Sequence, residues 1–159
     1  LRRMKRRHLG RDIIRFCNEA RRRRPDVAFG ADIIAGFPTE SWSAHRQTMA
    51  MIKDAGISYL PVFPYSPRLS TPAADMPQLD RAVIKNRAGE LRELGKTQLQ
   101  QHLETVIGTT ERMLVESGNV GRGRNFAKIR LDQPFVPAST LVDVKIYQRD
   151  QDTLLAHAV

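Results

Sequence analysis

Asp-Ile-Ile-Ala-Gly-Phe-Pro-Thr-Glu, residues 32–40, is the stretch from which a fold can be predicted for the rest of the chain. Its apolar residues lead into Gly36 and Pro38, which predicts a buried strand over residues 27–35 that runs into a tight turn. Asp32 lies inside this strand, where a charge is costly unless it is paired or meets a ligand. The stretch therefore predicts a core strand that carries one carboxylate, and this carboxylate needs an ion-pair partner or a ligand.

The turn after this strand is placed where ligands bind in α/β proteins. Gly36 has no Cβ, so another backbone or a ligand can approach it closely. In parallel α/β sheets, ligands bind beyond the carboxyl ends of the strands, and this turn occupies such an end. The stretch thus predicts the floor of a small-molecule site. An ordinary buried strand with a capping turn explains the same spacing, because short motifs of this kind often occur without a site.

Length and composition restrict the class of protein. The chain has 159 residues, enough for one domain or slightly more, and its single cysteine, Cys17, excludes a disulfide framework and any three-cysteine site within the chain. No apolar run reaches 18 residues and no signal peptide is recognisable, so we expect a cytoplasmic protein with no membrane partner. Leu1, Met4 and Leu9 read as the end of a helix whose beginning is missing, which suggests a fragment.

The net charge of +9 is concentrated in the N-terminal part of the chain. Residues 1–24 hold eleven lysines and arginines against Asp12 and Glu19, which accounts for the whole excess. The block Arg21–Arg24 could neutralise phosphates, so RNA is the natural partner to test. A solvated helical face is the alternative explanation of such a run.

The first two thirds of the chain alternate between helix and strand. Helices are predicted over residues 10–23 and 43–55, the second closed by Gly56, and a second strand is predicted over residues 57–63. The prolines of residues 64–72 then hold a loop extended, and we expect this loop to leave the same sheet edge as the Gly36 turn. Within the loop, Arg68 has two interpretations. It either binds a carboxylate or phosphate group of a ligand, or it is an ordinary exposed loop residue.

The last third changes character after a long helix, which is predicted from Asp80 to about Val106. Residues 108–159 alternate short β-rich segments with turn residues, which predicts a small antiparallel barrel or sheet. The loop 121–125 reads as flexible and basic, and an RNA backbone is its natural ligand. The predicted strands are Arg112–Glu116, Phe126–Leu131, Leu141–Tyr147 and Thr153–Ala158.

Three motifs together resemble a known family. Met4-Lys5-Arg6, the stretch 32–40 and Val-Phe-Pro-Tyr-Ser-Pro-Arg at 62–68 resemble the radical S-adenosylmethionine methylthiotransferases, most closely the MtaB-type branch. That branch adds a methylthio group to threonylcarbamoyladenosine next to the anticodon of tRNA. The resemblance implies an α/β fold, in which residues 1–107 form the C-terminal part of a partial (β/α)6 radical SAM barrel. Residues 108–159 are placed like the all-β TRAM domain of the family, which binds tRNA.

The resemblance also implies site residues and partners. S-adenosylmethionine would be held by Arg6, Asp32, Ile34 and Gly36, with Arg68 in the facing loop. The anticodon stem-loop of tRNA is the expected nucleic-acid partner, and its expected contacts are Arg122, Arg124 and Lys128.

The chain departs from the family pattern in ways that bear on activity. The CxxxCxxC motif that holds the [4Fe–4S] cluster is absent, as is the domain with a second cluster, and Cys17 cannot replace either. We therefore expect this polypeptide alone to be inactive, with no catalytic residue of its own, and a missing N-terminal half of the enzyme is a possible partner. Leu69-Ser70 replace a common Pro-Gly, and Ser41–His45 lack the usual acidic residues.

Two other functions remain open from the sequence. A sister methylthiotransferase acting on isopentenyladenosine or on a ribosomal protein shares the same general pattern. A non-catalytic basic RNA-binding protein would depend on residues 2–24 and the loop 121–125.

Overall fold

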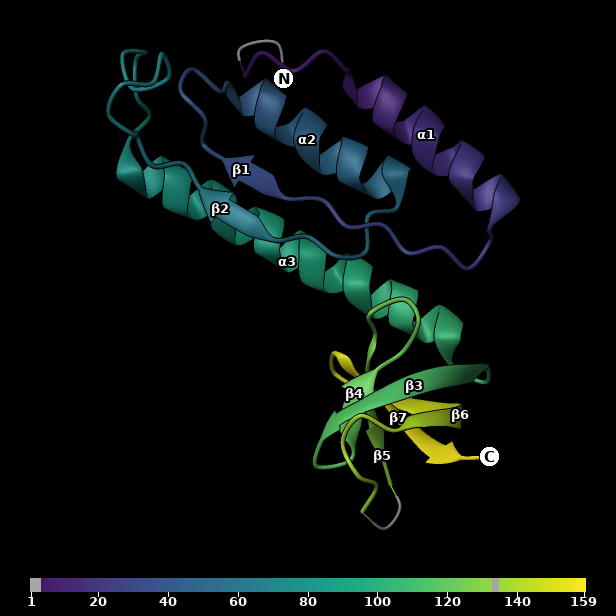
Figure 1. Ribbon diagram of the computed structural model, residues 1–159. Helices are drawn as coiled ribbons and strands as arrows, with labels where there is room; N and C mark the ends of the chain where they lie inside the picture. The colour runs from purple at the N-terminus through teal and green to yellow at the C-terminus, as the bar shows by residue number, and fades with distance from the viewer. Residues whose placement is uncertain (1–3, 133–134) are drawn as a thin grey trace. The chain divides into compact units, whose positions relative to one another are not determined.

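Residues 4–132 and 135–159 are described by a computed structural model, in which the chain forms two compact units (Figure 1). The first unit is Leu1–Gln98 and the second is Leu99–Val159. The division falls inside α3, Arg81–Val106, because the last turns of this helix pack on the core of the second unit. The assignment of residues 1–107 and 108–159 to family domains stays a prediction.

The helices of the first unit follow the sequence prediction, and cap residues mark both ends of the second one. They are α1 (Gly10–Arg23), α2 (Trp42–Ala55) and the greater part of α3, close to the predicted bounds. Ser41 Oγ accepts a hydrogen bond from the Ala44 amide at 3.1 Å, and Gly56 ends α2 in the left-handed region at φ +58°. Local capping chemistry therefore sets the boundaries of α2.

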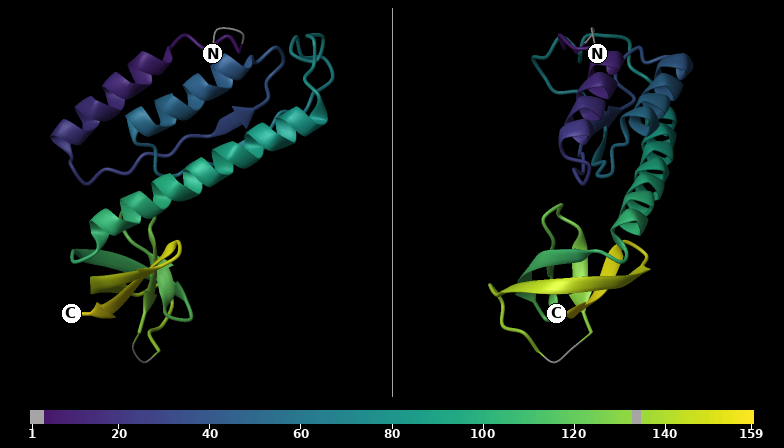
Figure 2. Two further views of the ribbon diagram at one scale, coloured as in Figure 1. Left: turned by 180° about the vertical axis from the view of Figure 1, so that it is seen from behind. Right: turned by 90° about the vertical axis from the view of Figure 1, so that its right-hand side faces the viewer.

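The sheet of the first unit is a pair of parallel strands, β1 (Ile33–Ala35) and β2 (Val62–Pro64). Both are shorter than predicted, because before them the two segments share only the bridge between Gly30 and Tyr59 and scattered backbone bonds. The three helices lie on one face of this sheet (Figure 2). The buried core between sheet and helices consists of Cys17, Ala35, Ile52, Ala55, Ile57, Ala88, Leu91 and Leu94.

The second unit is a closed barrel with strand order β3-β4-β5-β7-β6 (Figure 1). Its strands are β3 (Thr110–Ser117), β4 (Val120–Arg122), β5 (Lys128–Leu131), β6 (Leu141–Asp150) and β7 (Thr153–Ala158). Alternate side chains point inward and fill the barrel with a continuous apolar core. Its buried members are Leu103, Met113, Val115, Ala127, Ile129, Leu131, Val144, Ile146, Leu154 and Ala156.

Three sequence predictions need correction. The barrel is not wholly antiparallel, because β5 and β7 pair in parallel. Part of the loop predicted over residues 121–125 is strand, since Gly121 and Arg122 belong to β4. The helix end predicted near Met4 is wrong, because residues 4–9 form no helix in the structure, and Leu1 lies outside the described residues. Among the helices that the structure describes, none is long and apolar enough to cross a lipid bilayer.

Candidate functional site

The turn that follows β1 is held tightly against α3. Gly36 is buried with φ +74°, and a Cβ placed on it would lie 2.7 Å from Cγ1 of Ile84 in α3. Both the backbone conformation and the close approach of Ile84 therefore require glycine. The structure thus gives Gly36 a packing role, and its predicted place against a cofactor stays a prediction.

The turn and the proline-rich loop leave the same edge of the sheet, as predicted. The Tyr65 amide donates to the carbonyl of Ala35 at 2.8 Å, which joins the end of β1 to the residue after β2. The rings of Phe37 and Tyr65 meet edge to face, with centroids 5.5 Å apart. The two loops therefore form one continuous surface at the carboxyl end of the parallel pair.

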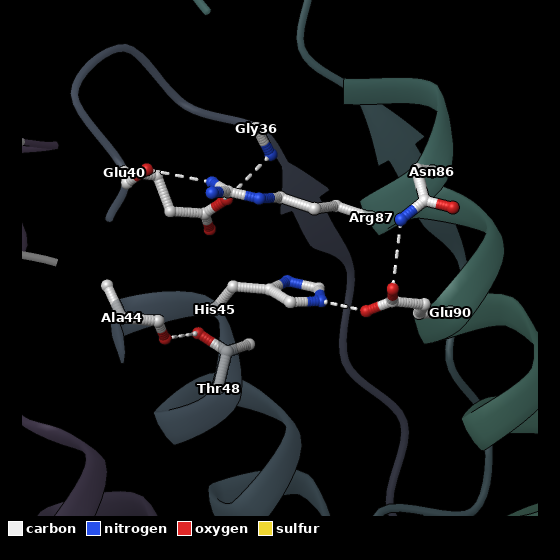
Figure 3. A network of polar contacts seen from close by, with 8 residues as sticks. All are labelled: Gly36, Glu40, Ala44, His45, Thr48, Asn86, Arg87 and Glu90. Carbon is white, nitrogen blue, oxygen red and sulfur yellow. Dashed lines mark hydrogen bonds and ion pairs between the residues drawn. The ribbon is translucent and has the colours of Figure 1, made fainter. Parts of the chain in front are cut away.

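A buried ion pair fixes the far end of the turn (Figure 3). Arg87 Nη1 of α3 lies 2.6 Å from Glu40 Oε2 and 2.8 Å from the Glu40 carbonyl, and both side chains are almost fully buried. The same carboxylate oxygen accepts the Gly36 amide at 3.2 Å. Glu40 therefore ties both ends of its own turn together, and Arg87 neutralises it from the helix.

A second polar link joins α2 to α3 beside this pair (Figure 3). The fully buried His45 contacts Glu90 through Nε2 at 2.7 Å, and Asn86 Nδ2 donates to the other Glu90 oxygen at 3.0 Å. Trp42 stacks on the His45 ring with centroids 5.4 Å apart. Sequence reasoning missed His45, Arg87 and Glu90, since each contacts a residue more than forty positions away.

The opposite face of the sheet is open. Asp32 is exposed, Ile34 is 40% exposed, and its partner across the strands, Phe63, is 52% exposed. Alternation along β1 explains this, because Ile33 and Ala35 turn toward the helices while Asp32 and Ile34 turn away. A carboxylate and two apolar side chains are thus presented together on a surface that no helix of this unit covers.

The remaining predicted cofactor residues are two arginines at the protein surface. Arg6 and Arg68 are both exposed, and neither side chain makes a hydrogen bond or ion pair with another described residue. A groove of about 740 Å³ runs along α3 beside Met49 of α2, but it contains none of the predicted site residues. Asp32 and Ile34 lie on the open face, while Gly36 and Arg68 lie in the two loops beside it, and their role in holding a cofactor stays a prediction.

The arginine block of α1 is largely engaged within the first unit. The Arg21 guanidinium donates to the carbonyl of Gly56 at 3.0 Å and to that of Ala55, which satisfies the C-terminal end of α2. Arg22 and Arg23 both pair with Glu19, and Arg24 pairs with Asp26. Much of the block thus supports helix structure.

Cys17 is unsuited to a metal or cluster. It lies buried in the helical core, and burial raises the pKa of its thiol, which disfavours the thiolate that metals bind. Across the residues that the structure describes, no group of three or more His, Cys, Asp or Glu side chains could hold a metal ion.

The predicted nucleic-acid residues lie together on one hairpin of the barrel. Arg122 ends β4 and Lys128 begins β5, and the two are directly paired across the strands, with Arg124 in the turn between them. All three are exposed. Arg122 Nε lies 3.9 Å from Glu116 and Arg124 Nε lies 3.6 Å from Glu111.

Comparison with known proteins gives a consistent set of relatives, although no family model matches the chain. The threonylcarbamoyladenosine tRNA methylthiotransferase MtaB of Rickettsia prowazekii is 46% identical over 133 residues, which is 84% of this chain and 32% of the relative. The tRNA-2-methylthio-N(6)-dimethylallyladenosine synthase of Vibrio campbellii is 38% identical, covering 71% of this chain and 24% of the relative. The synthase of Agrobacterium fabrum is 31% identical, covering 98% of this chain and 36% of the relative.

The chain matches between 24% and 36% of the length of these curated relatives. The motifs at residues 4–6, 32–40 and 62–68, the structured turn at Gly36 and the similarity along nearly the whole chain agree with one another. Over the residues matched, this chain belongs to the family of tRNA methylthiotransferases.

Proposed function

We propose that this chain forms part of a tRNA methylthiotransferase that adds a methylthio group to threonylcarbamoyladenosine next to the anticodon. The observation that carries this proposal is the 46% identity to the Rickettsia prowazekii enzyme over 84% of the chain. The dimethylallyladenosine synthases are more distant, at 38% identity for the Vibrio campbellii protein. Threonylcarbamoyladenosine is therefore favoured over dimethylallyladenosine as the substrate. The expected location is the cytoplasm, where tRNA is modified.

The open face of the first unit is suited to line a cofactor pocket. In a partial (β/α)6 barrel the helices lie outside and the uncovered face of the sheet points inward. The helices here cover one face of β1 and β2 and leave the other open, which supports this assignment. Asp32 offers a carboxylate to an ammonium group or a ribose hydroxyl, and Ile34 offers an apolar surface to a planar base. S-adenosylmethionine has all three of these groups, so the residues present fit it.

S-adenosylmethionine, when bound and cleaved by one electron from an iron–sulfur cluster held outside these residues, would supply the radical that activates an adenine C–H bond. This chain's residues would bind and orient it and exclude water. Arg68 is free to pair with a carboxylate from the loop beside the pocket, and Arg6 is free to do so from before α1. The buried Glu40–Arg87 pair would act on the pocket by positioning the turn. An iron–sulfur cluster does not fit these residues, since Cys17 is buried and isolated, and we assign none to them.

The barrel of the second unit would be the RNA-binding part, in the manner of a TRAM domain. Small closed barrels that bind nucleic acid commonly do so through basic and aromatic residues on strands and hairpins. The hairpin with Arg122, Arg124 and Lys128 has this chemistry. The tRNA anticodon stem-loop is the proposed ligand.

A chimeric enzyme tests the whole proposal. The matched segment of the Rickettsia prowazekii enzyme is replaced by this chain, and the chimera is expressed in a bacterium that lacks its own threonylcarbamoyladenosine methylthiotransferase. We expect mass spectrometry of tRNA nucleosides to show the methylthio derivative. Asp32→Ala in the chimera should abolish the product, while Asp54→Ala, an exposed carboxylate on α2, should leave it unchanged. A folded chimera that leaves tRNA unmodified would overturn the proposal.

A further inference from the structure

The hairpin between β4 and β5 is closed by an ordered turn. The Phe126 amide donates to the Gly123 carbonyl at 3.1 Å, and the Gly123 amide donates to the Ala127 carbonyl at 3.0 Å. Ala127 is buried in the barrel core, which anchors one side of the turn. Arg122 Nη1 donates to the Phe126 carbonyl at 3.0 Å and holds the other side. The turn is therefore fixed from within the barrel.

Phe126 occupies a backbone position that favours glycine. Its φ is +62°, in the left-handed region, at the residue that follows a β-turn centred on Arg124 and Asn125. Hairpin loops of this form place glycine or asparagine there, because a bulky side chain is strained. The Phe126 ring is nonetheless 74% exposed, so it gains little packing in return. The structure thus holds an aromatic ring in solvent at a conformational cost.

A second unfavourable interaction, the repulsion between two cations, lies at the base of the same hairpin. Arg122 and Lys128 stand directly opposite each other across β4 and β5, and like charges in that position destabilise a sheet. The nearest carboxylate to Arg122 is that of Glu116, at 3.9 Å, and Lys128 has no ion pair among the described residues. An anion placed between the two cations would relieve their repulsion.

We propose that this hairpin is a base-stacking RNA site, in which the Phe126 ring stacks on an unpaired nucleobase while Arg122 and Lys128 contact neighbouring phosphates. The proposal rests on the proposed function of the second unit in binding tRNA and names the part of the barrel that does so. Every nucleobase has a π-face, so a single exposed ring binds single-stranded RNA without needing a shaped pocket. The anticodon loop is single-stranded and supplies such bases.

The surroundings of the ring favour RNA over a protein partner. A protein-docking site surrounds its aromatic anchor with further apolar side chains that exclude water. The turn instead places Arg124 and Asn125 beside Phe126, with Arg122 and Lys128 at its base. A ring bordered by cations and an amide suits a stacked base between phosphates.

Fluorescence with the full chain tests the site. The probe is a synthetic anticodon stem-loop RNA with 2-aminopurine in its loop, whose fluorescence falls when the base stacks. Wild-type protein should bind and quench it. Phe126→Asn, which suits the positive φ, should weaken binding about tenfold and abolish the quenching, in line with the loss of one stacking contact. The thermal midpoint should stay unchanged or rise, an outcome that a structural role for the ring would not give.

Two further variants separate the possible outcomes. Phe126→Trp should retain binding and quenching, and Phe135→Asn, which removes an equally exposed ring (76%) outside the hairpin, should behave as wild type. Equal affinity and quenching for Phe126→Asn and wild type would overturn the stacking site while leaving tRNA binding intact. Equal losses for Phe126→Asn and Phe135→Asn would also overturn it. If wild type itself does not bind the stem-loop, tRNA binding by this chain fails and the stacking site fails with it.

Discussion

The two units of this molecule reach stability by different routes. The barrel closes on itself, so each strand has two neighbours and its interior is wholly apolar. The described part of the first unit has two paired strands and one uncovered sheet face, with a buried ion pair between its turn and α3 and a polar link between α2 and α3. A two-stranded sheet is not stable without partners, so the first unit depends on its helices and on the Glu40–Arg87 pair to hold its shape.

This difference determines what kind of surface each unit can offer to a ligand. A closed barrel has no inner surface to offer, so any ligand must contact its outer strands and hairpins. An open sheet face offers a surface but must be held rigid by contacts behind it. Asp32 and Ile34 lie on that face, and Glu40 and Arg87 fix the turn at its end. The variants below test this contrast in order of expected effect.

The largest effect should come from Arg87→Ala, which leaves the Glu40 carboxylate buried without its partner. We expect the free energy of unfolding of the first unit to fall by about 3–5 kcal/mol. Urea unfolding followed by the fluorescence of Trp42, the chain's single tryptophan, measures this unit. Arg81→Ala, an exposed arginine on the same helix, is the control and should have little effect. Equal midpoints for the two variants would show that the buried pair does not hold the turn.

A matched pair of isoleucines compares the closed interior with the open face. Ile146→Ala removes a fully buried side chain from the barrel and should lower the unfolding free energy by about 3 kcal/mol. Ile34→Ala removes the same atoms from a side chain that is 40% exposed, so its effect should be much smaller. Hydrogen exchange of the β6 and β1 amides measures the two effects separately. A loss of equal size at Ile34 would mean that the sheet face is not open.

Two glycines should respond to alanine with opposite signs. Gly36→Ala adds a Cβ in contact with Ile84 at a positive φ, and should destabilise the first unit by about 2 kcal/mol. Gly89→Ala in the middle of α3 meets open space and should stabilise it by about 0.5–1 kcal/mol. Combining Gly36→Ala with Ile84→Ala should remove the contact at Cγ1 but leave the backbone strain. The Trp42 unfolding midpoint checks all three, and stabilisation by Gly36→Ala would refute the packing role.

Local signals explain what could be predicted from the sequence. Gly56 ends α2 as predicted, because a left-handed cap needs only one residue type at one position. The tight turn at Gly36 was predicted from the glycine and Pro38 that follow the apolar residues. The strand before it was predicted to be buried on both faces, which is wrong, because Asp32 and Ile34 are exposed and the charge of Asp32 is solvated. Sequence reasoning predicted β1 and β2 as too long, because hydrophobicity marks the core segments but does not show that the ladder is interrupted at Pro61, which has no amide to donate.

Contacts between distant residues explain what could not be predicted. Arg87 contacts Glu40 across 47 positions, and no spacing rule connects them. β4 was not predicted, because Val120–Arg122 is only a short segment and its glycine is more typical of a loop than of a strand. Its glycine is required, since a Cβ on Gly121 would lie 1.9 Å from the carbonyl oxygen of Leu114. The exposure of Phe126 likewise depends on how β4 and β5 pair.

The smallest effect should come from the exposed Arg112–Asp143 pair on the outside of the barrel. Arg112 Nε donates to Asp143 at 2.9 Å, and this hydrogen bond holds the pKa of the Asp143 carboxyl below its ordinary value of 3.8. A lowered folded-state pKa means that the pair contributes stability above the ordinary value and loses it as the pH falls through the lowered one. Because both groups are exposed, solvent and salt screen the contribution. Arg112→Ala should therefore leave the neutral-pH midpoint of the barrel nearly unchanged and flatten its loss of stability below about pH 4. Thermal unfolding followed by β-sheet circular dichroism over that range measures it, and a large loss at pH 7 would show that the closed barrel depends on surface charge as well as on its core.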